Sequence, residues 1–160
     1  SQAIIRTIPN TPSSILKGIT AMYFNINCNS QIIENAEILM NAVGETIKVN
    51  DEELMDAYTA VSGSGPAYIF YMVEAMIDAG IQIGIHPDNA KKLAEKTLIG
   101  SAYLLENRNE DAQELRKAVT SLKGTTEAGL EVLMKSNIFF NLVKNAINEA
   151  KNRGKDLGKL

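Results

Sequence analysis

The sequence has no tryptophan, one cysteine and one histidine among its 160 residues. A single cysteine, Cys28, excludes an internal disulfide framework and any zinc site built from several cysteines. A single histidine, His86, likewise excludes a site with several histidine ligands, so we expect no metal centre. A Ser-His-Asp triad needs only one histidine, and composition alone leaves that class open.

An excess of charge and an uninterrupted apolar run are also missing. The chain carries 16 basic and 19 acidic residues, for a formal net charge of −3, which disfavours a broad basic surface for nucleic acid. Glu74 and Asp78 interrupt the longest mostly apolar stretch, which argues against a membrane span. The start of the chain lacks the pattern of a secretory signal, so we expect cytoplasmic residence. Its first segment, without an initiator Met, reads as the end of something larger.

Residues 3–50 alternate short β-prone runs with one helical pattern. The helical spacing covers residues 32–43, with Ser30 as the expected N-cap and Gly44 just beyond the end. Three short strands and one helix cannot cover a sheet, so this region is predicted to belong to a larger α/β domain. The expected strands cover residues 3–8, 19–26 and 46–50.

Residues 51–160 are predicted to be almost entirely helical, with no repeat. The segment 66–80 is apolar on nearly every side and must be buried on most faces, which indicates a partner subunit. Glu74 within it is either a buried acid or a group facing a polar seam or a partner. The expected helices cover residues 51–61, 66–80, 87–107, 112–119, 129–136 and 138–154.

Two glycine-containing breaks separate these helices. In SGSGPA (62–67), the free amides before Pro66 could bind an anion, although simple helix-hairpin geometry is the favoured interpretation. This is not a dinucleotide fingerprint, because Tyr68 stands where the third glycine belongs.

The second break, TSLKGTT (120–126), places Thr125 and Thr126 after Gly124 at an expected helix start. Backbone donors beside two hydroxyls suit a carboxylate with an adjacent hydrogen-bonding atom. Ordinary Ser/Thr capping is the alternative, and Lys123 is either an attracting charge or a solvated lysine.

Several segments in this order resemble one enzyme family. Asn10-Thr11-Pro12, AVG (42–44), EELMDAYTAVSGSGPAY (52–68) and VTSLKGTTEAGL (119–130) together resemble the C-terminal portion of pyrroline-5-carboxylate reductase. The resemblance implies a mainly α fold. Residues 1–50 would be the remnant of a dinucleotide-binding Rossmann domain. Residues 51–160 would be a helical dimerisation and substrate-binding domain, like the C-terminal domain of 6-phosphogluconate dehydrogenase.

The same resemblance implies an oxidoreductase that reduces 1-pyrroline-5-carboxylate to L-proline with NADPH or NADH, the last step of proline biosynthesis. It implies an interlocked homodimer, or a larger assembly, with the substrate at the dimer interface. The Asn10-Thr11-Pro12 turn would lie near the nicotinamide, and the Thr126 hydroxyl would contact the ring nitrogen as the catalytic group. The substrate-binding residues would be Ser121, Gly124, Thr125 and Thr126.

The sequence departs from the family pattern in two places. Leu122-Lys123 stands where the family usually has Pro-Gly, which adds a β-carbon to a close-approach loop. No G-x-G-x-x-G follows a strand, so we expect this chain alone to bind the cofactor poorly and to be inactive. The ribose-reading residues would lie in the absent half, so NADH and NADPH are not distinguished. A non-catalytic dimerisation module, or a divergent paralogue, is the alternative.

Overall fold

The computed structural model describes residues 2–159, which form two compact units. Among the described residues, the sheet unit comprises residues 2–68 and 144–159, and the helical unit comprises residues 69–143. The elements are β1 (Ile5–Ile8), η1 (Thr11–Ile15), β2 (Gly18–Phe24), α1 (Ser30–Asn41), β3 (Gly44–Val49), η2 (Glu52–Leu54), α2 (Met55–Tyr58), η3 (Thr59–Gly63), α3 (Gly65–Gln82), α4 (Pro87–Asn107), α5 (Ala112–Ala118), α6 (Thr125–Met134), η4 (Lys135–Asn137) and α7 (Ile138–Leu157).

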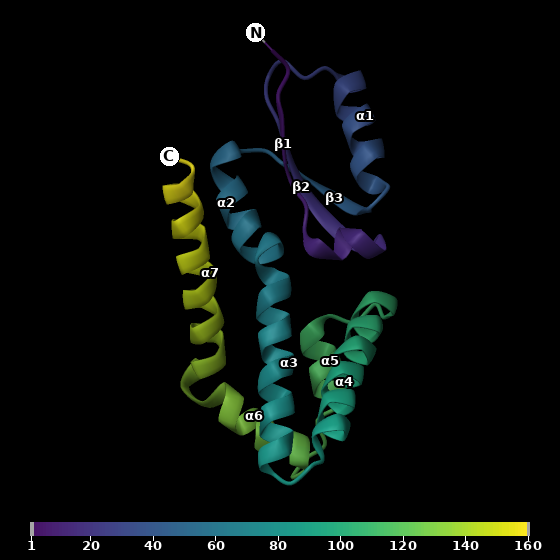
Figure 1. The fold of residues 1–160 in the computed structure, drawn as a ribbon, viewed down its shortest axis with the longest axis vertical. Helices are drawn as coiled ribbons and strands as arrows, with labels where there is room; N and C mark the ends of the chain where they lie inside the picture. The colour runs from purple at the N-terminus through teal and green to yellow at the C-terminus, as the bar shows by residue number, and fades with distance from the viewer. Residues whose placement is uncertain (1, 160) are drawn as a thin grey trace. The chain divides into compact units, whose positions relative to one another are not determined.

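The sheet unit is built on three strands in the order β1-β2-β3. β1 pairs antiparallel with β2, and β3 pairs parallel with β2 after the crossover through α1. Figure 1 shows the three strands together with α1 alongside them. The buried core of this unit centres on Ala21, Val49 and Met55. The central strand β2 is therefore the most buried element of the sheet.

The entry into β3 depends on two glycines that face each other. Gly44 has a φ of +150°, and a β-carbon on it would lie 2.6 Å from the backbone nitrogen of Gly18. No side chain fits there. The sequence predicted that Gly44 would lie just past the helix end, and this is wrong, because α1 ends at Asn41 and Gly44 is the first residue of β3. The Ser30 N-cap prediction is also wrong, because the Asn29 side chain accepts from the Ile32 amide at 2.9 Å. An Asn side chain in extended backbone is a strong N-cap.

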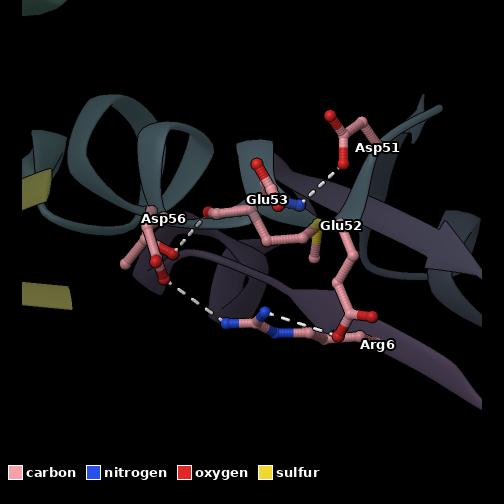
Figure 2. A network of polar contacts seen from close by, with 7 residues as sticks. Arg6, Asp51, Glu52, Glu53 and Asp56 are labelled. Carbon is pink, nitrogen blue, oxygen red and sulfur yellow. Dashed lines mark hydrogen bonds and ion pairs between the residues drawn. The ribbon is translucent and has the colours of Figure 1, made fainter. Parts of the chain in front are cut away.

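Arg6 on β1 links the sheet to the helices that follow it (Figure 2). Its guanidinium lies 3.6 Å from Glu52 and 3.4 Å from Asp56, whose carboxylates stand one helical turn apart. Asp51 caps the same segment by accepting from the Glu53 amide at 2.9 Å. The groups are partly exposed, so each ion pair contributes little alone, but together they fix where the helical segment begins.

The segment 52–82 continues as helix through the SGSGPA break. Helix was expected over 51–61, and the structure has a 3-10 turn, the short α2 and the π-helical η3 there. The favoured helix-hairpin interpretation of SGSGPA is wrong, because the Ser64 amide donates to the Thr59 carbonyl at 2.8 Å. The Thr59 and Ser62 hydroxyls donate to carbonyls four residues earlier, a bond that widens or bends a helix.

The helical unit buries very little apolar surface by itself. Among its described residues only Ala90 and Ala94 are buried, both on α4. Gly80 of α3 lies close to this point, since a β-carbon there would be 3.3 Å from that of Ala90. Large apolar side chains stay exposed, including Phe70, Tyr71, Met76, Leu93, Tyr103 and Val132.

The prediction of a mainly α fold with a short α/β region is confirmed. Between residues 55 and 157 the structure has six α-helices, and the described residues 66–107 contain no strand. α4 has the predicted bounds, whereas α6 begins at Thr125, four residues earlier than expected. The division into domains at residues 50 and 51 stays a prediction.

None of the helices within residues 2–159 combines the length and the apolar character that crossing a membrane requires. Cytoplasmic residence stays a prediction of the sequence.

Met55 and Leu54 allow a matched test of the sheet-unit core. Met55 is 0% exposed and Leu54 is 46% exposed. Met55→Ala should lower the free energy of unfolding by about 2–5 kcal/mol, because it leaves a cavity. Leu54→Ala should cost clearly less, since much of its side chain is already in solvent. Urea unfolding at one fixed protein concentration measures both, and equal losses would contradict this description of the core.

Candidate functional site

The loop between α5 and α6 is the main candidate site, and its first residue is held by the end of α5. The Thr120 hydroxyl donates to the Arg116 carbonyl at 2.6 Å, and the Thr120 amide donates to the Lys117 carbonyl at 3.1 Å. These bonds satisfy carbonyls at the end of the helix. The loop therefore leaves α5 in a fixed direction.

The next four residues form a tight turn. The Gly124 amide donates to the Ser121 carbonyl at 3.0 Å, and Lys123 at the third position has a φ of +56°. A positive φ at that position is typical of a type II turn, which favours glycine. A side chain in this left-handed region costs about 1–2 kcal/mol. The Lys123 amide donates to the Glu127 carboxylate at 2.6 Å.

Gly124 is required by close packing inside this turn. A β-carbon there would meet the Ser121 hydroxyl oxygen and would lie 3.0 Å from the Ser121 carbonyl oxygen. The absence of a side chain lets Ser121 fold over the start of α6. This places the Ser121 hydroxyl against Gly124, the N-cap residue of α6.

α6 begins without a side-chain cap. Gly124 is its N-cap, and Thr125 and Thr126 occupy the first helical positions. No hydrogen-bond acceptor within residues 2–159 is recorded for their amides, and neither threonine hydroxyl caps the helix. Ordinary Ser/Thr capping, the alternative interpretation of this segment, is therefore wrong. Exposed amides at a helix start, with hydroxyls beside them, are suited to a carboxylate.

The Asn10-Thr11-Pro12 turn belongs to the sheet unit, whereas the 121–126 loop belongs to the helical unit. The Asn10 side-chain oxygen accepts from the Ile19 amide at 3.0 Å, which fastens the turn to the start of β2. Pro12 stands in the first turn of η1. Thr11 is exposed, and the described residues provide no partner for its hydroxyl.

The other residues singled out in the sequence offer no site. Glu74 is exposed in this chain, so it is not a buried acid here. His86 occupies the N-cap position of α4 without a side-chain capping bond. The Cys28 thiol donates to the Ile4 carbonyl at 3.3 Å. Within residues 2–159, no group of three or more metal-ligating side chains gathers at one place.

Glu127 is the residue of this site that the sequence analysis missed. Its position, third in a helix that starts with two threonines, was a usable signal, because Glu at that position often reaches back to bond a preceding amide. Although a helix start was expected at Thr125 and Thr126, the helix itself was assigned to residues 129–136, so Glu127 was treated as part of the polar break.

Comparison with known proteins identifies relatives of this chain, and the matched residues include the loop. A family model described as pyrroline-5-carboxylate reductase dimerisation matches residues 52–157. A pyrroline-5-carboxylate reductase of Pseudomonas aeruginosa is 39% identical over 154 residues, covering 96% of this chain and 56% of the relative. One of Synechocystis is 41% identical over 157 residues, covering 98% and 58% respectively. The chain thus spans a little over half the length of these relatives.

Solved structures agree with this placement. A pyrroline-5-carboxylate reductase of Coxiella burnetii matches with a TM-score of 0.92 and 38% identity, over 98% of this chain and 57% of that chain. The Plasmodium falciparum pyrroline carboxylate reductase, solved with NADP bound, matches with a TM-score of 0.88 and 32% identity, over 99% and 63%.

The left-handed backbone of Lys123 gives a prediction with a matched control. Lys123→Gly should raise the free energy of unfolding by about 1 kcal/mol, because glycine adopts this conformation without a β-carbon clash. The same change at exposed Lys92, inside α4, should lower it by about 1 kcal/mol. Chemical unfolding of both variants provides the comparison, and loss of stability at both positions would refute the strain at Lys123.

Proposed function

The chain belongs to the pyrroline-5-carboxylate reductase family, and on that premise we propose that it supplies the substrate-binding and dimerisation part of a reductase. The proposed reaction is the NAD(P)H-dependent reduction of 1-pyrroline-5-carboxylate to L-proline, the last step of proline biosynthesis. The observation that carries the proposal is the 121–126 loop at the start of α6. There the Thr125 and Thr126 amides have no side-chain cap, and the hydroxyls of the same residues cap nothing. Since the relatives are longer, the activity is proposed for the protein that carries this chain.

The substrate carboxylate is proposed to bind at the start of α6. The amides of Thr125 and Thr126 would donate to it, together with the Ser121 hydroxyl. Gly124 keeps Ser121 close enough to contribute, because it leaves the space into which the Ser121 side chain folds. The positive end of the helix dipole adds attraction for the anion. The site needs neither a nucleophile nor a metal ion for this step.

Thr126 is proposed as the catalytic residue. The cyclic substrate carries its imine nitrogen one bond from the carbon that bears the carboxylate. A hydroxyl beside the carboxylate site is therefore within reach of that nitrogen. As hydride adds to the imine carbon, the electron pair of the C=N bond moves onto nitrogen, and a proton from water on that nitrogen completes the secondary amine. A donated hydrogen bond from Thr126 stabilises this change, and a preorganised donor is worth about 2–4 kcal/mol.

The cofactor is proposed to be NADPH or NADH, which supplies the hydride when bound. The Asn10-Thr11-Pro12 turn offers the Asn10 amide nitrogen and the exposed Thr11 hydroxyl, donors that fit the carboxamide of a nicotinamide. The chain has no G-x-G-x-x-G after a strand to hold the phosphates. We therefore expect residues 1–160 alone to be inactive, and the choice between the two cofactors stays open.

A homodimer is proposed as the working form. The family model matched by residues 52–157 is a dimerisation domain. Phe70 and Tyr71 on α3 are 61% and 73% exposed in the single chain, and the helical unit buries only two alanines. A second copy interlocked along α3 would cover this surface. Larger assemblies built from such dimers are compatible with the same contacts.

Activity and stability should separate in a variant of Thr126. In the full protein, Thr126→Ala should lower kcat by about 10²–10³-fold with little change in melting temperature, because the hydroxyl caps nothing. Asp111→Ala is the control: it removes the side chain that caps α5 by accepting from the Glu114 amide at 2.8 Å, and it should cost about 1 kcal/mol of stability with kcat preserved. A parent protein that forms dimers but reduces no substrate with either cofactor would instead identify a non-catalytic dimerisation module.

Phe70→Asp tests the proposed dimer. The parent should sediment as a dimer or larger assembly at micromolar concentration, and the variant should dissociate, since a charge cannot be buried unpaired in an apolar interface. Asn109→Asp, which adds the same charge between α4 and α5, should leave the assembly intact. A parent that sediments as a stable monomer would refute the proposal.

A further inference from the structure

Glu127 makes an unusual bond at the start of α6. Its carboxylate accepts from the Lys123 amide at 2.6 Å, and Lys123 precedes the N-cap residue Gly124. In an ordinary capping box, a glutamate at this third position bonds the N-cap amide itself. The same chain shows that ordinary form on α5, where Glu114 accepts from the Asp111 amide at 3.0 Å. Glu127 therefore reaches one residue further, into the loop.

The hydrogen bond to Glu127 is made by Lys123, whose backbone is in the strained left-handed region. Lys123 is the non-glycine residue with positive φ in the 119–126 segment. The Gly124 amide donates to the Ser121 carbonyl and closes the turn, and the Lys123 amide donates a second hydrogen bond to the Glu127 carboxylate. Without that carboxylate, the Lys123 amide has no acceptor among the described residues. The lysine would then be free to leave the left-handed region and open the turn.

We propose that Glu127 is a positioning residue for the substrate: it holds Lys123 left-handed and thereby keeps Ser121 packed against Gly124 at the start of α6. The inference rests on the proposed function, since it concerns the loop that binds the substrate carboxylate. A carboxylate acceptor makes a stronger hydrogen bond than a neutral one, which suits it to hold a strained residue. The residue does not touch the substrate and acts through the turn.

A competing role predicts the opposite result. If the Glu127 carboxylate occupied a place that the substrate carboxylate needs, removing it would tighten substrate binding. If it positions the turn, removing it weakens binding. The sign of the change in KM therefore decides between a positioning residue and an internal competitor.

The experiment compares five variants of the full protein by steady-state kinetics and melting temperature. Glu127→Ala should raise KM for the substrate about tenfold, the effect of losing one charge-assisted hydrogen bond, with a smaller change in kcat. Glu127→Gln keeps an oxygen acceptor and should recover most of this loss. In the double variant Lys123→Gly/Glu127→Ala, KM should stay within about threefold of Lys123→Gly alone, since glycine needs no support. Glu114→Ala removes the ordinary capping glutamate of α5 and should lower stability with KM unchanged.

A lower KM in Glu127→Ala, or a KM unchanged as in Glu114→Ala, overturns the inference. An inactive parent counts against the proposed function, and amide hydrogen exchange then decides the inference separately. Slow exchange at Lys123 in the parent that becomes fast in Glu127→Ala supports the positioning bond. Fast exchange at Lys123 in the parent overturns it.

Discussion

Burial of apolar surface is the constraint on which the rest of the structure depends. The sheet unit closes a core around Ala21, Val49 and Met55, but the helical unit has only Ala90 and Ala94 inside. At about 25 cal/mol for each Å² of apolar surface, two alanines cannot offset the ordering entropy of residues 69–143. The homodimer proposed above would supply the missing apolar contacts for α3 and α4. Because the 121–126 loop belongs to this unit, we expect its shape to depend on the same association.

In the proposed substrate loop, backbone groups would bind the ligand and side chains hold the backbone in place. Ser121 folds into the space that Gly124 leaves, and the first amides of α6 stay open because no side chain caps them. Such a site is rigid for a small substrate, since the donors belong to a helix and not to mobile side chains. Such a site should also be sensitive to changes in residues that hold the loop without lining it, and Glu127, which accepts from the Lys123 amide, is the clearest candidate.

The sequence was most informative where apolar periodicity was long. Pro87 and the pattern after it predicted α4 with its observed bounds, and the loop around Gly124 was identified from its glycine and threonines. Details set by single hydrogen bonds were missed. Asn29 outcompetes Ser30 as the cap because its backbone is extended and its oxygen reaches the Ile32 amide. The π-helical η3 and the bond from the Lys123 amide to Glu127 depend on individual hydrogen bonds in the folded chain, and the spacing of apolar residues does not predict them.

The facing pair Gly18 and Gly44 has a consequence for strand alignment. Because a β-carbon on Gly44 would meet the Gly18 backbone where β2 and β3 start, only glycine fits at position 44, whereas a side chain at Gly18 would meet Ser13. A slip of β3 by one residue would bring Val43 or Glu45 against Gly18 and would turn every following side chain to the opposite face. The contact therefore acts as a stop that permits a single alignment of the parallel strands. Gly44 is thus required by the backbone of the neighbouring strand and Gly18 by Ser13 of η1, so the start of the parallel pair depends on two separate steric limits.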